Sequence, residues 1–558
     1  MKFARLIALL LWPLAVHAQD VEVAPEAATG RAERAVASAS RHMVVAAHPL
    51  AAEAGRQILR QGGSAVDAAM AAALVLGLVE PQSSGLGGGG FLLHFAAKDA
   101  AVTSYDGRET APMAAKPDRF LGPDGQPVAF FDAVVGGRSV GVPGMVRLLE
   151  LAHRKHGRLA WAQLFEPALR LAEDGFPVSD RLHSLLADDS YLRRNPAAAE
   201  LYYPGGKPVA VGSILRNRAY SDTLRLLAGQ GADAFYRGAV AAALVRAAGS
   251  DLTQADLAAY RAVERPALCR PYRVWLICGM GPPSSGGVAV AQILAILEPL
   301  DMGDFAHVFS EAGRLAYADR ARYLADSDFV AVPVAGLLDR DYLRARAALI
   351  GERSMGMAPA GEIGPAWGQP QGPDVPGTTH LSVVDGDGNG VALTASIENS
   401  FGARILVGGM LLNNQLTDFS FRPEQGGRPV ANRVEGGKRP LSAMAPTVVL
   451  DRDRRLVAVL GSPGGSFIIN YVAKTLIGLL DWHLDPQAAV DLPNLGSRNG
   501  PTVLEAGTPA EALRPALESR GHQVRVTDLT SGLHAIVVTP IGLLGGADSR
   551  REGAAAGD

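Results

Sequence analysis

Two strand-like runs joined by a tight turn constrain this chain more than any other feature. The runs TTHLSVVD and VALTAS, which begin at Thr378 and Val391, are rich in β-branched residues and flank the turn sequence GDGNG. A hairpin folded about residues 387–388 places Thr378 opposite Ser396 or Glu398. The sequence therefore predicts that polar side chains from both strands meet at the open end of the hairpin.

The segment before this hairpin cannot hold regular structure. Residues 364–377, GPAWGQPQGPDVPG, contain four glycines and four prolines in fourteen positions. Such a composition disfavours both a helix and a central strand. It indicates a linker that ends abruptly at Thr378.

The rest of the sequence indicates a mixed α+β fold. Helical spacing of apolar residues extends from Val44 to Val79, and a glycine-rich loop then leads into a strand, followed by a second strand at residues 101–107. Residues 140–260 are mostly helical, and another helix covers residues 310–325. With 558 residues, we expect one large two-layered unit or two subdomains.

The N-terminus has the pattern of a signal peptide. Lys2 and Arg5 precede an apolar run, and Val16-His17-Ala18 follows the small-x-small pattern of a cleavage site. The apolar run is about ten residues long, short of the roughly twenty that span a bilayer. We expect cleavage after Ala18, export to the periplasm or medium, and no membrane span afterwards.

The charge and the cysteine content of the chain limit which partners, disulfides and metal sites can be expected. The formal net charge is −3 without basic blocks, which gives no indication of nucleic-acid binding. Cys269 and Cys278 flank the strand-like RPYRVWLI. An exported chain permits a disulfide, but the sequence leaves their pairing open, and a zinc site requires more ligands nearby. No metal or cofactor is predicted.

Thr378 raises a chemical question. A threonine hydroxyl is a poor nucleophile without a base, and the residue's own α-amine can serve only if the threonine is N-terminal. An α-amine titrates at about 7.7 to 8.0, so part of it is neutral at pH 7. A cut before Thr378 would create this base, whereas without a cut the residue simply opens a strand.

The sequence resembles the γ-glutamyltransferases of the N-terminal nucleophile hydrolase superfamily across nearly the whole mature chain. The motifs that carry this resemblance appear in the family's order: HPLAAEAGRQILRQGGSAVDAAMAAAL, SSGLGGGGF, DGRETAP, PPSSGG, AYADRARYL, GTTHLSVVD, LLNNQLTDFS, KRPLSAMAPT and GSPGGS. Family members are precursors that cut themselves before the first threonine of the TTH segment. The resemblance implies a four-layer αββα sandwich, a large subunit of residues 19–377 and a small catalytic subunit of residues 378–558.

The resemblance also implies a role for each matching residue. Thr378 is the nucleophile and Ser396 supports its hydroxyl. Gly464 and Gly465 donate backbone N–H groups to the oxyanion, where the absence of side chains allows close approach.

Further matching residues hold the substrate. Arg108 binds the α-carboxylate of the substrate, for which a guanidinium is well suited, and Ser442 is a second hydrogen-bond donor to this carboxylate. Gln415 and Asp418 hold its α-ammonium.

Three positions depart from the family pattern. Glu398 stands at an ammonium-binding position where most members have asparagine, which adds negative charge and could favour a different acyl group. The usual serine pair is Ser442-Ala443, so one hydroxyl is lost. Residues 421–437 are shorter than in members with a lid and lack its aromatic residue, so the acyl site is expected to be more open.

Four short motifs are set aside. GRSVG around Ser139 imitates a nucleophile elbow, but Pro143 delays the helix that should follow. GLGGGG lies in the reverse of the Rossmann order. DGDGNG at residues 385–390 imitates a calcium loop but lies between strands. HRKH at residues 153–156 has no third metal ligand in evidence.

The sequence thus predicts an exported enzyme that cleaves glutathione or related γ-glutamyl compounds and transfers the acyl group to water, amino acids or peptides. Two alternatives stay open: a glutaryl or cephalosporin acylase on the same scaffold, and a binding protein that has lost processing.

Overall fold

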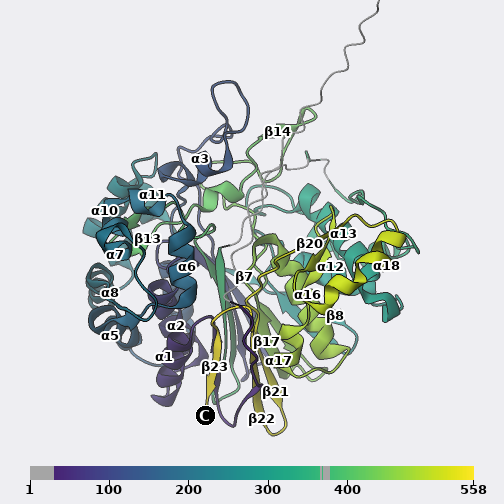
Figure 1. Ribbon diagram of the computed structural model, residues 1–558, viewed down its shortest axis with the longest axis horizontal. Helices are drawn as coiled ribbons and strands as arrows, with labels where there is room; N and C mark the ends of the chain where they lie inside the picture. The colour runs from purple at the N-terminus through teal and green to yellow at the C-terminus, as the bar shows by residue number, and fades with distance from the viewer. Residues whose placement is uncertain (1–29, 365–366, 369–376) are drawn as a thin grey trace, which may run out of the picture.

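The computed structural model describes residues 30–364, 367–368 and 377–558. Within these ranges, two seven-stranded antiparallel sheets pack against each other, and helices cover the outer face of each (Figure 1). The result is the predicted four-layer αββα arrangement, so the α+β fold class is confirmed. The predicted signal peptide and most of the linker lie outside the described residues.

The first sheet lies beside the helices at the right of Figure 1. Its strands run in the order β1 (Ala37–Ala39), β22 (Gly542–Ala547), β21 (His534–Thr539), β17 (Leu456–Gly461), β16 (Thr447–Leu450), β9 (Trp275–Gly279) and β8 (Leu268–Tyr272). The helices that cover it are α12 (Gly286–Leu297), α13 (Phe305–Tyr323), α16 (Ile468–Leu480) and α17 (Pro486–Asp491).

The second sheet carries the hairpin. Its strands run in the order β23 (Ala554–Gly557), β2 (Met43–Ala46), β10 (Thr378–Val384), β11 (Gly390–Ser396), β3 (Gly89–Ala96), β4 (Ala101–Gly107) and β7 (Val263–Pro266). Its covering helices include α1 (Pro49–Arg60), α2 (Ala65–Val79), α4 (Met145–His156), α5 (Glu166–Asp174) and α8 (Arg218–Gln230).

The layering buries both faces of the central strands. In β2, Val44 and Ala46 belong to the apolar core under the helices, whereas Met43 and Val45 belong to the core between the sheets and beneath the opposite helices. Since side chains alternate between faces, a strand in this position has to be apolar throughout. The prediction of helix from Val44 onward was therefore wrong at its start.

The segment predicted as one helix is a strand followed by two helices. Helix α1 has a proline at its first turn, and α2 begins with a capping box between Ser64 and Asp67. Both are start signals that the sequence contains. The strand expected after the glycine-rich loop is present as β3, and the expected strand at residues 101–107 and helix around residues 310–325 are present as well.

The register of the hairpin is one of the two that were predicted. Strands β10 and β11 pair antiparallel with Thr378 opposite Ser396, and all residues of both strands are buried. The GDGNG turn is closed by Asp385, whose carboxylate accepts hydrogen bonds from the backbone N–H groups of Asp387 and Asn389 at 3.0 Å. The motif thus forms a turn, in agreement with its interpretation.

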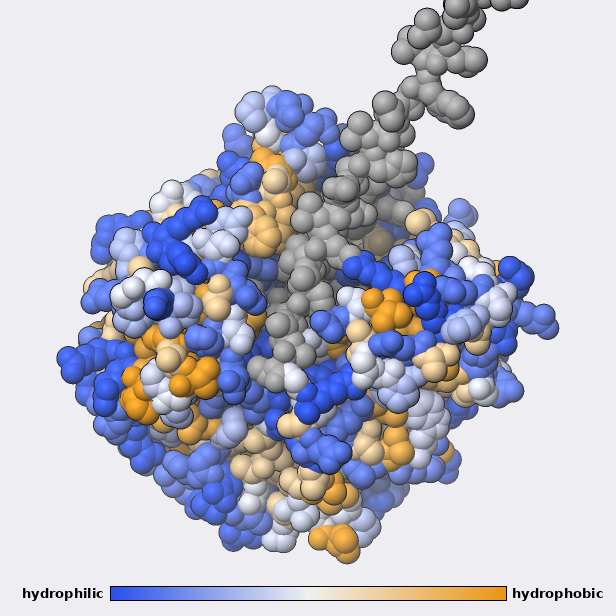
Figure 2. All heavy atoms as spheres, in the orientation of Figure 1, coloured by the Kyte–Doolittle hydropathy of each residue, from blue (hydrophilic) through white to orange (hydrophobic). Residues whose placement is uncertain are grey.

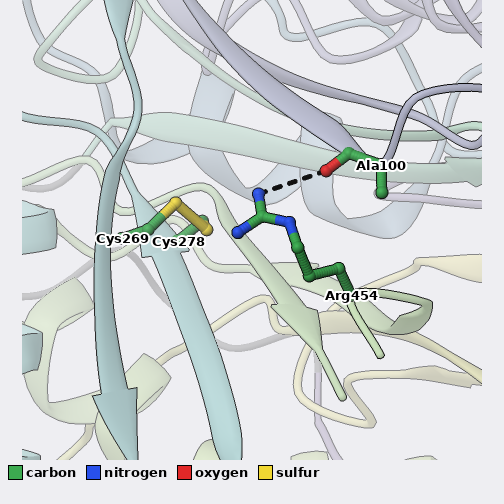
Figure 3. Close-up of a disulfide and its surroundings, with 4 residues drawn as sticks. All are labelled: Ala100, Cys269, Cys278 and Arg454. Atoms are coloured by element: carbon green, nitrogen blue, oxygen red, sulfur yellow. Dashed lines mark hydrogen bonds between the residues drawn. A yellow bond between two sulfur atoms is a disulfide. The ribbon is translucent and has the colours of Figure 1, made fainter. Parts of the chain in front are cut away.

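Cys269 and Cys278 form a disulfide, which answers the question that the sequence left open. They face each other in the register of β8 and β9 at the edge of the first sheet, with an S–S distance of 2.01 Å (Figure 3). In the same region, Arg454 donates a hydrogen bond to the carbonyl oxygen of Ala100 at 3.2 Å, which links the ends of two strands.

The visible face of the molecule is mostly hydrophilic, with small separate apolar patches (Figure 2). Among the described residues, none of the helices combines the length and the apolar character that crossing a bilayer requires.

Candidate active site

One pocket brings together eight of the nine predicted site residues; Gly464, next to one of them, is the exception. Its lining comes from segments that are far apart in the chain: Arg108, Arg320, Thr378, Ser396, Glu398, Gln415, Asp418, Leu441, Ser442, Ala443, Met444, Gly465, Ser466 and Ile468. The hairpin supplies Thr378 and Ser396 from the second sheet. The loop after β17 supplies Gly465 from the first sheet, so the pocket contains residues from both.

A chain of hydroxyl groups ends at the peptide bond before Thr378. The Thr378 hydroxyl donates to Ser396 Oγ at 3.2 Å, and Ser396 Oγ donates to the carbonyl oxygen of Gly377 at 2.6 Å. Ser396 Oγ also accepts from the backbone N–H of Glu398 at 2.8 Å, which fixes its position. A donor on this carbonyl oxygen stabilises negative charge that develops there during attack on the carbon.

Two glycines allow the backbone to pack closely around this point. A Cβ on Gly377 would lie 1.7 Å from the carbonyl oxygen of Glu398, and one on Gly88 would lie 2.2 Å from that of Ser396. Neither position has room for a side chain. The GLGGGG motif therefore packs a loop against the end of the hairpin.

An ion pair holds the predicted carboxylate-binding arginine. Arg108 Nη2 donates to Asp418 at 2.5 Å and to the carbonyl oxygen of Leu441 at 2.9 Å, and the arginine side chain is 1% exposed. Gln415 Nε2 donates to the same Asp418 oxygen at 2.8 Å. The residue predicted to bind the substrate's α-carboxylate, Arg108, is thus in direct contact with Asp418, one of the residues predicted to bind its α-ammonium.

Glu109 is a buried carboxyl group next to Arg108. It is fully buried, its nearest oxygen is 3.8 Å from Arg108 Nη1, and neither of its oxygens has a hydrogen-bond partner among the described residues. Burial raises the pKa of Glu109 to about 8, with the Arg108 charge opposing that rise.

Glu398 is held in a strained backbone conformation, with a φ of 77°. Its carboxylate accepts hydrogen bonds from Asn414 Nδ2 and, at 3.4 Å, from Thr417 Oγ1. Burial raises the pKa of Glu398 well above its usual value, and the nearby Asp418 charge adds to the rise. Two carboxyl groups thus share the end of the pocket predicted for an ammonium.

The Ser442 backbone is fixed from both sides. Its hydroxyl accepts from the backbone N–H of Met444 at 3.1 Å, and its carbonyl oxygen accepts from Ser285 Oγ at 2.6 Å. Ser442 therefore lies on a fixed segment of the pocket wall, next to Ala443, which also lines the pocket.

The predicted oxyanion loop has a conformation that suits glycine. Gly464 has a φ of 129° and Gly465 a φ of 59°, and a Cβ on Gly464 would lie 2.5 Å from the ring of Tyr471. Tyr317 donates its hydroxyl to the carbonyl oxygen of Ser466, which anchors the loop to α13.

Sequence reasoning missed several residues of the pocket. They are Arg320, Leu441, Met444, Ser466 and Ile468, together with Asn414, which holds Glu398. Arg320 lies within the motif AYADRARYL, but helical periodicity alone gives no reason to select it over Arg322 in the same motif.

The segment at residues 421–437 is ordered. It contains a two-stranded hairpin of β14 (Glu424–Gln425) and β15 (Arg428–Pro429), and Phe421 stacks on Phe120 with ring centres 4.6 Å apart.

Two motifs that were set aside make structural contacts. The buried Ser139 hydroxyl donates to the carbonyl oxygens of Val134 and Gly136. In HRKH, His153 contacts the carbonyl oxygen of Leu159, and His156 contacts the Tyr105 hydroxyl.

A buried group of His307, Glu311 and His522 has metal-like composition. His522 contacts His307 at 2.8 Å and Thr502 Oγ1 at 2.7 Å, and His307 contacts the carbonyl oxygen of Gly351 at 2.8 Å. These contacts use all four ring nitrogens, which indicates a structural hydrogen-bond network.

Comparison with known proteins decides the family. The family model described as gamma-glutamyltranspeptidase matches residues 51–558. The chain belongs to the γ-glutamyltranspeptidase family. Within this family, it is 36% identical over 543 residues to the glutathione hydrolase proenzyme of Bacillus subtilis strain 168, covering 92% of this chain and 91% of that protein.

Other γ-glutamyltranspeptidase relatives have acylase names. The chain is 37% identical over 543 residues to the acylase ACY 1 proenzyme of Pseudomonas sp. strain SE83, covering 94% of each. The crystal structure of a cephalosporin acylase from Bacillus halodurans superposes with a TM-score of 0.82 at 27% identity, covering 96% of this chain and 99% of that one. The family and fold are thus established, whereas the relatives' names divide between two acyl specificities.

Proposed function

We propose that this chain is an exported, self-processing γ-glutamyl hydrolase and transferase with Thr378 as its nucleophile. Its donors are glutathione or related γ-glutamyl compounds, and its acceptors are water, amino acids or short peptides. The observation that carries the proposal is the position of Thr378 in the same pocket as the paired Arg108 and Asp418.

Processing is the first step in this proposal. Thr378 Oγ1 attacks the carbonyl carbon of Gly377, the peptide bond breaks, and its nitrogen takes up the hydroxyl proton, which leaves Gly377 as an ester on Thr378. This bond breakage frees the α-amine of Thr378, and water then hydrolyses the ester, which restores the Thr378 hydroxyl and releases Gly377 with a free carboxylate. The hydrogen bond from Ser396 to the Gly377 oxygen supports this step.

The products of processing are a large subunit of residues 19–377, once a signal peptide of residues 1–18 has been removed, and a small subunit of residues 378–558. The two subunits share both sheets. In the second sheet β10 pairs with β2 and β11 pairs with β3, and in the first sheet β16 pairs with β9 and β22 pairs with β1. We therefore expect them to stay together after the cut.

In the turnover that we propose, the free α-amine of Thr378 accepts the hydroxyl proton as Oγ1 attacks the γ-carbonyl of the donor. The backbone N–H groups of Gly464 and Gly465 stabilise the oxyanion. The donor amide bond breaks, its nitrogen leaves with the proton, and a γ-glutamyl ester remains on Thr378. Water or an amine then attacks the ester and releases the product. This chemistry requires no cofactor.

The two ends of the pocket suit the two charged groups of a γ-glutamyl donor. Arg108 and the Ser442 hydroxyl are donors suited to its α-carboxylate. Asp418, Gln415 and Glu398 offer the oxygens that an α-ammonium requires.

The deciding experiment compares two donors that differ only in the α-amino group. We expect kcat/KM for γ-glutamyl-p-nitroanilide to exceed that for glutaryl-p-nitroanilide by about a hundredfold or more, since a site built for a polar group rejects the analogue that lacks it. Thr378→Ala should abolish both activities.

A glutaryl or cephalosporin acylase is the second candidate. Glu398 favours it, because burial raises the pKa of this carboxyl group well above its usual value, and a protonated carboxyl group does not require an ammonium partner. Equal turnover of the two anilides would support this candidate. An uncut chain that turns over neither would support a binding protein.

A further inference from the structure

A second arginine, Arg320, lines the pocket from α13. It is half-buried, its Nε donates to Ser285 Oγ at 2.9 Å, and its guanidinium lies 5.8 Å from the centre of the Tyr317 ring. Across residues 30–364, 367–368 and 377–558, we find no carboxylate in an ion pair with Arg320. Arg108, in contrast, is already paired with Asp418. The pocket therefore contains a positive charge that these parts of the protein do not balance by a direct ion pair.

The contacts of Arg320 lead to the oxyanion loop. Tyr317, one turn earlier on α13, donates its hydroxyl to the carbonyl oxygen of Ser466 in that loop. Ser285, which accepts from Arg320, donates to the carbonyl oxygen of Ser442 at 2.6 Å. Arg320 is thus linked to the pocket wall formed by Ser442 and Ser466.

The ammonium end of the pocket has separate contacts. Glu398, Gln415 and Asp418 are held by Asn414, Thr417 and Arg108. The one hydrogen bond that we find for the Arg320 side chain, in the part of the chain that the structure describes, goes to Ser285. The two arginines therefore serve different parts of the pocket.

We propose that Arg320 binds the carboxylate of the leaving group in hydrolysis, and of the incoming amino acid or peptide in transfer. A guanidinium binds a carboxylate through two parallel N–H donors, and the contact to Ser285 uses only Nε. In the proposed function, Arg108 and Ser442 take the α-carboxylate of the acyl group. The remaining carboxylate of glutathione belongs to its leaving dipeptide. This inference rests on the proposed function and assigns the leaving-group site of the same pocket.

The test compares hydrolysis of glutathione, glutathione with its C-terminal carboxylate converted to the amide, and γ-glutamyl-p-nitroanilide. For the wild type, we expect kcat/KM to be about tenfold higher for glutathione than for its amide, the size of one charge-assisted hydrogen bond. Arg320→Gln should reduce this ratio to about one while leaving the anilide, which has no leaving-group carboxylate, within about threefold of wild type. Arg320→Lys should restore part of the ratio.

Arg322→Gln is the matched control, because Arg322 lies on the same helix against the Tyr323 ring and outside the pocket lining. It should keep the wild-type ratio, and intact mass should show each variant processed. A wild-type ratio of one, a ratio that persists in Arg320→Gln, or an equal loss of anilide hydrolysis would overturn the inference. If the proposed function itself is wrong, the result is different from these outcomes, because then even the wild type cleaves no γ-glutamyl donor.

Discussion

Ser396 lies directly opposite Thr378 in the β10–β11 pair, and its hydroxyl donates to the carbonyl oxygen that precedes Thr378. Removal of this donor should slow processing. We expect Ser396→Ala to cut itself on the order of tenfold more slowly than wild type, because one hydrogen bond to a developing charge is lost. The measurement is the fraction of uncut chain over time by gel or intact mass. Ser139→Ala, which changes a buried serine outside the pocket, should process at the normal rate.

Gly377 should tolerate no side chain. In Gly377→Ala, the added Cβ would meet the carbonyl oxygen of Glu398, so the segment has to move and the scissile carbonyl loses its position. We expect mostly uncut protein. Gly386→Ala is the control, because a Cβ there meets nothing within 4 Å. Normal cutting of Gly377→Ala would show that the contact does not govern processing.

Glu398 should tune the acyl specificity. Glu398→Gln keeps the size of the side chain but removes a carboxyl group from the ammonium end, where Asp418 remains. We expect the preference for γ-glutamyl over glutaryl anilide to fall by about tenfold, mainly through the KM of the γ-glutamyl donor. An unchanged preference would show that Asp418 and Gln415 alone recognise the ammonium.

Glu109 should make the stability of the chain depend on pH. Its pKa is about 8 in the folded chain against an ordinary value of 4.5, so the folded state binds the proton more tightly. The stability from this group is present below pH 4.5 and is lost as the pH rises through 8. Glu109→Gln removes this dependence.

The free energy of unfolding of Glu109→Gln, relative to wild type, should therefore rise by on the order of 3 kcal/mol between pH 5 and pH 8. Denaturant titrations at both pH values measure it, and Glu352→Gln, at an exposed position, is the control. A constant difference between variant and wild type across this range would contradict the assignment.

The hairpin shows what local sequence can predict. Counting residues from the turn placed Thr378 opposite Ser396 or Glu398, and the structure has the pairing with Ser396. The prediction of a helix from Val44 was wrong at its start, because a strand that is buried on both faces has the same continuous apolar sequence as a buried helix. Ser64 and Pro49, which signal helix starts, were the better guides.

The pocket shows what local sequence cannot predict. Arg108, Asp418 and Ser442 are far apart in the chain, and only the family resemblance suggested that they belong together. Arg320 was missed because its meaning depends on which side chains surround it after folding. An arginine on a helix is usually solvated or paired. Only the structure shows that Arg320 lines the pocket and that, among the described residues, it has no ion-pair partner.

The central claim is that Thr378 becomes an N-terminal nucleophile by self-cleavage. Intact mass and N-terminal sequencing of purified wild type beside Thr378→Ala test it most directly. The account predicts a wild-type fragment that begins Thr-Thr-His and is absent from the variant. A single uncut chain in both proteins, or the same fragment in both, would contradict it.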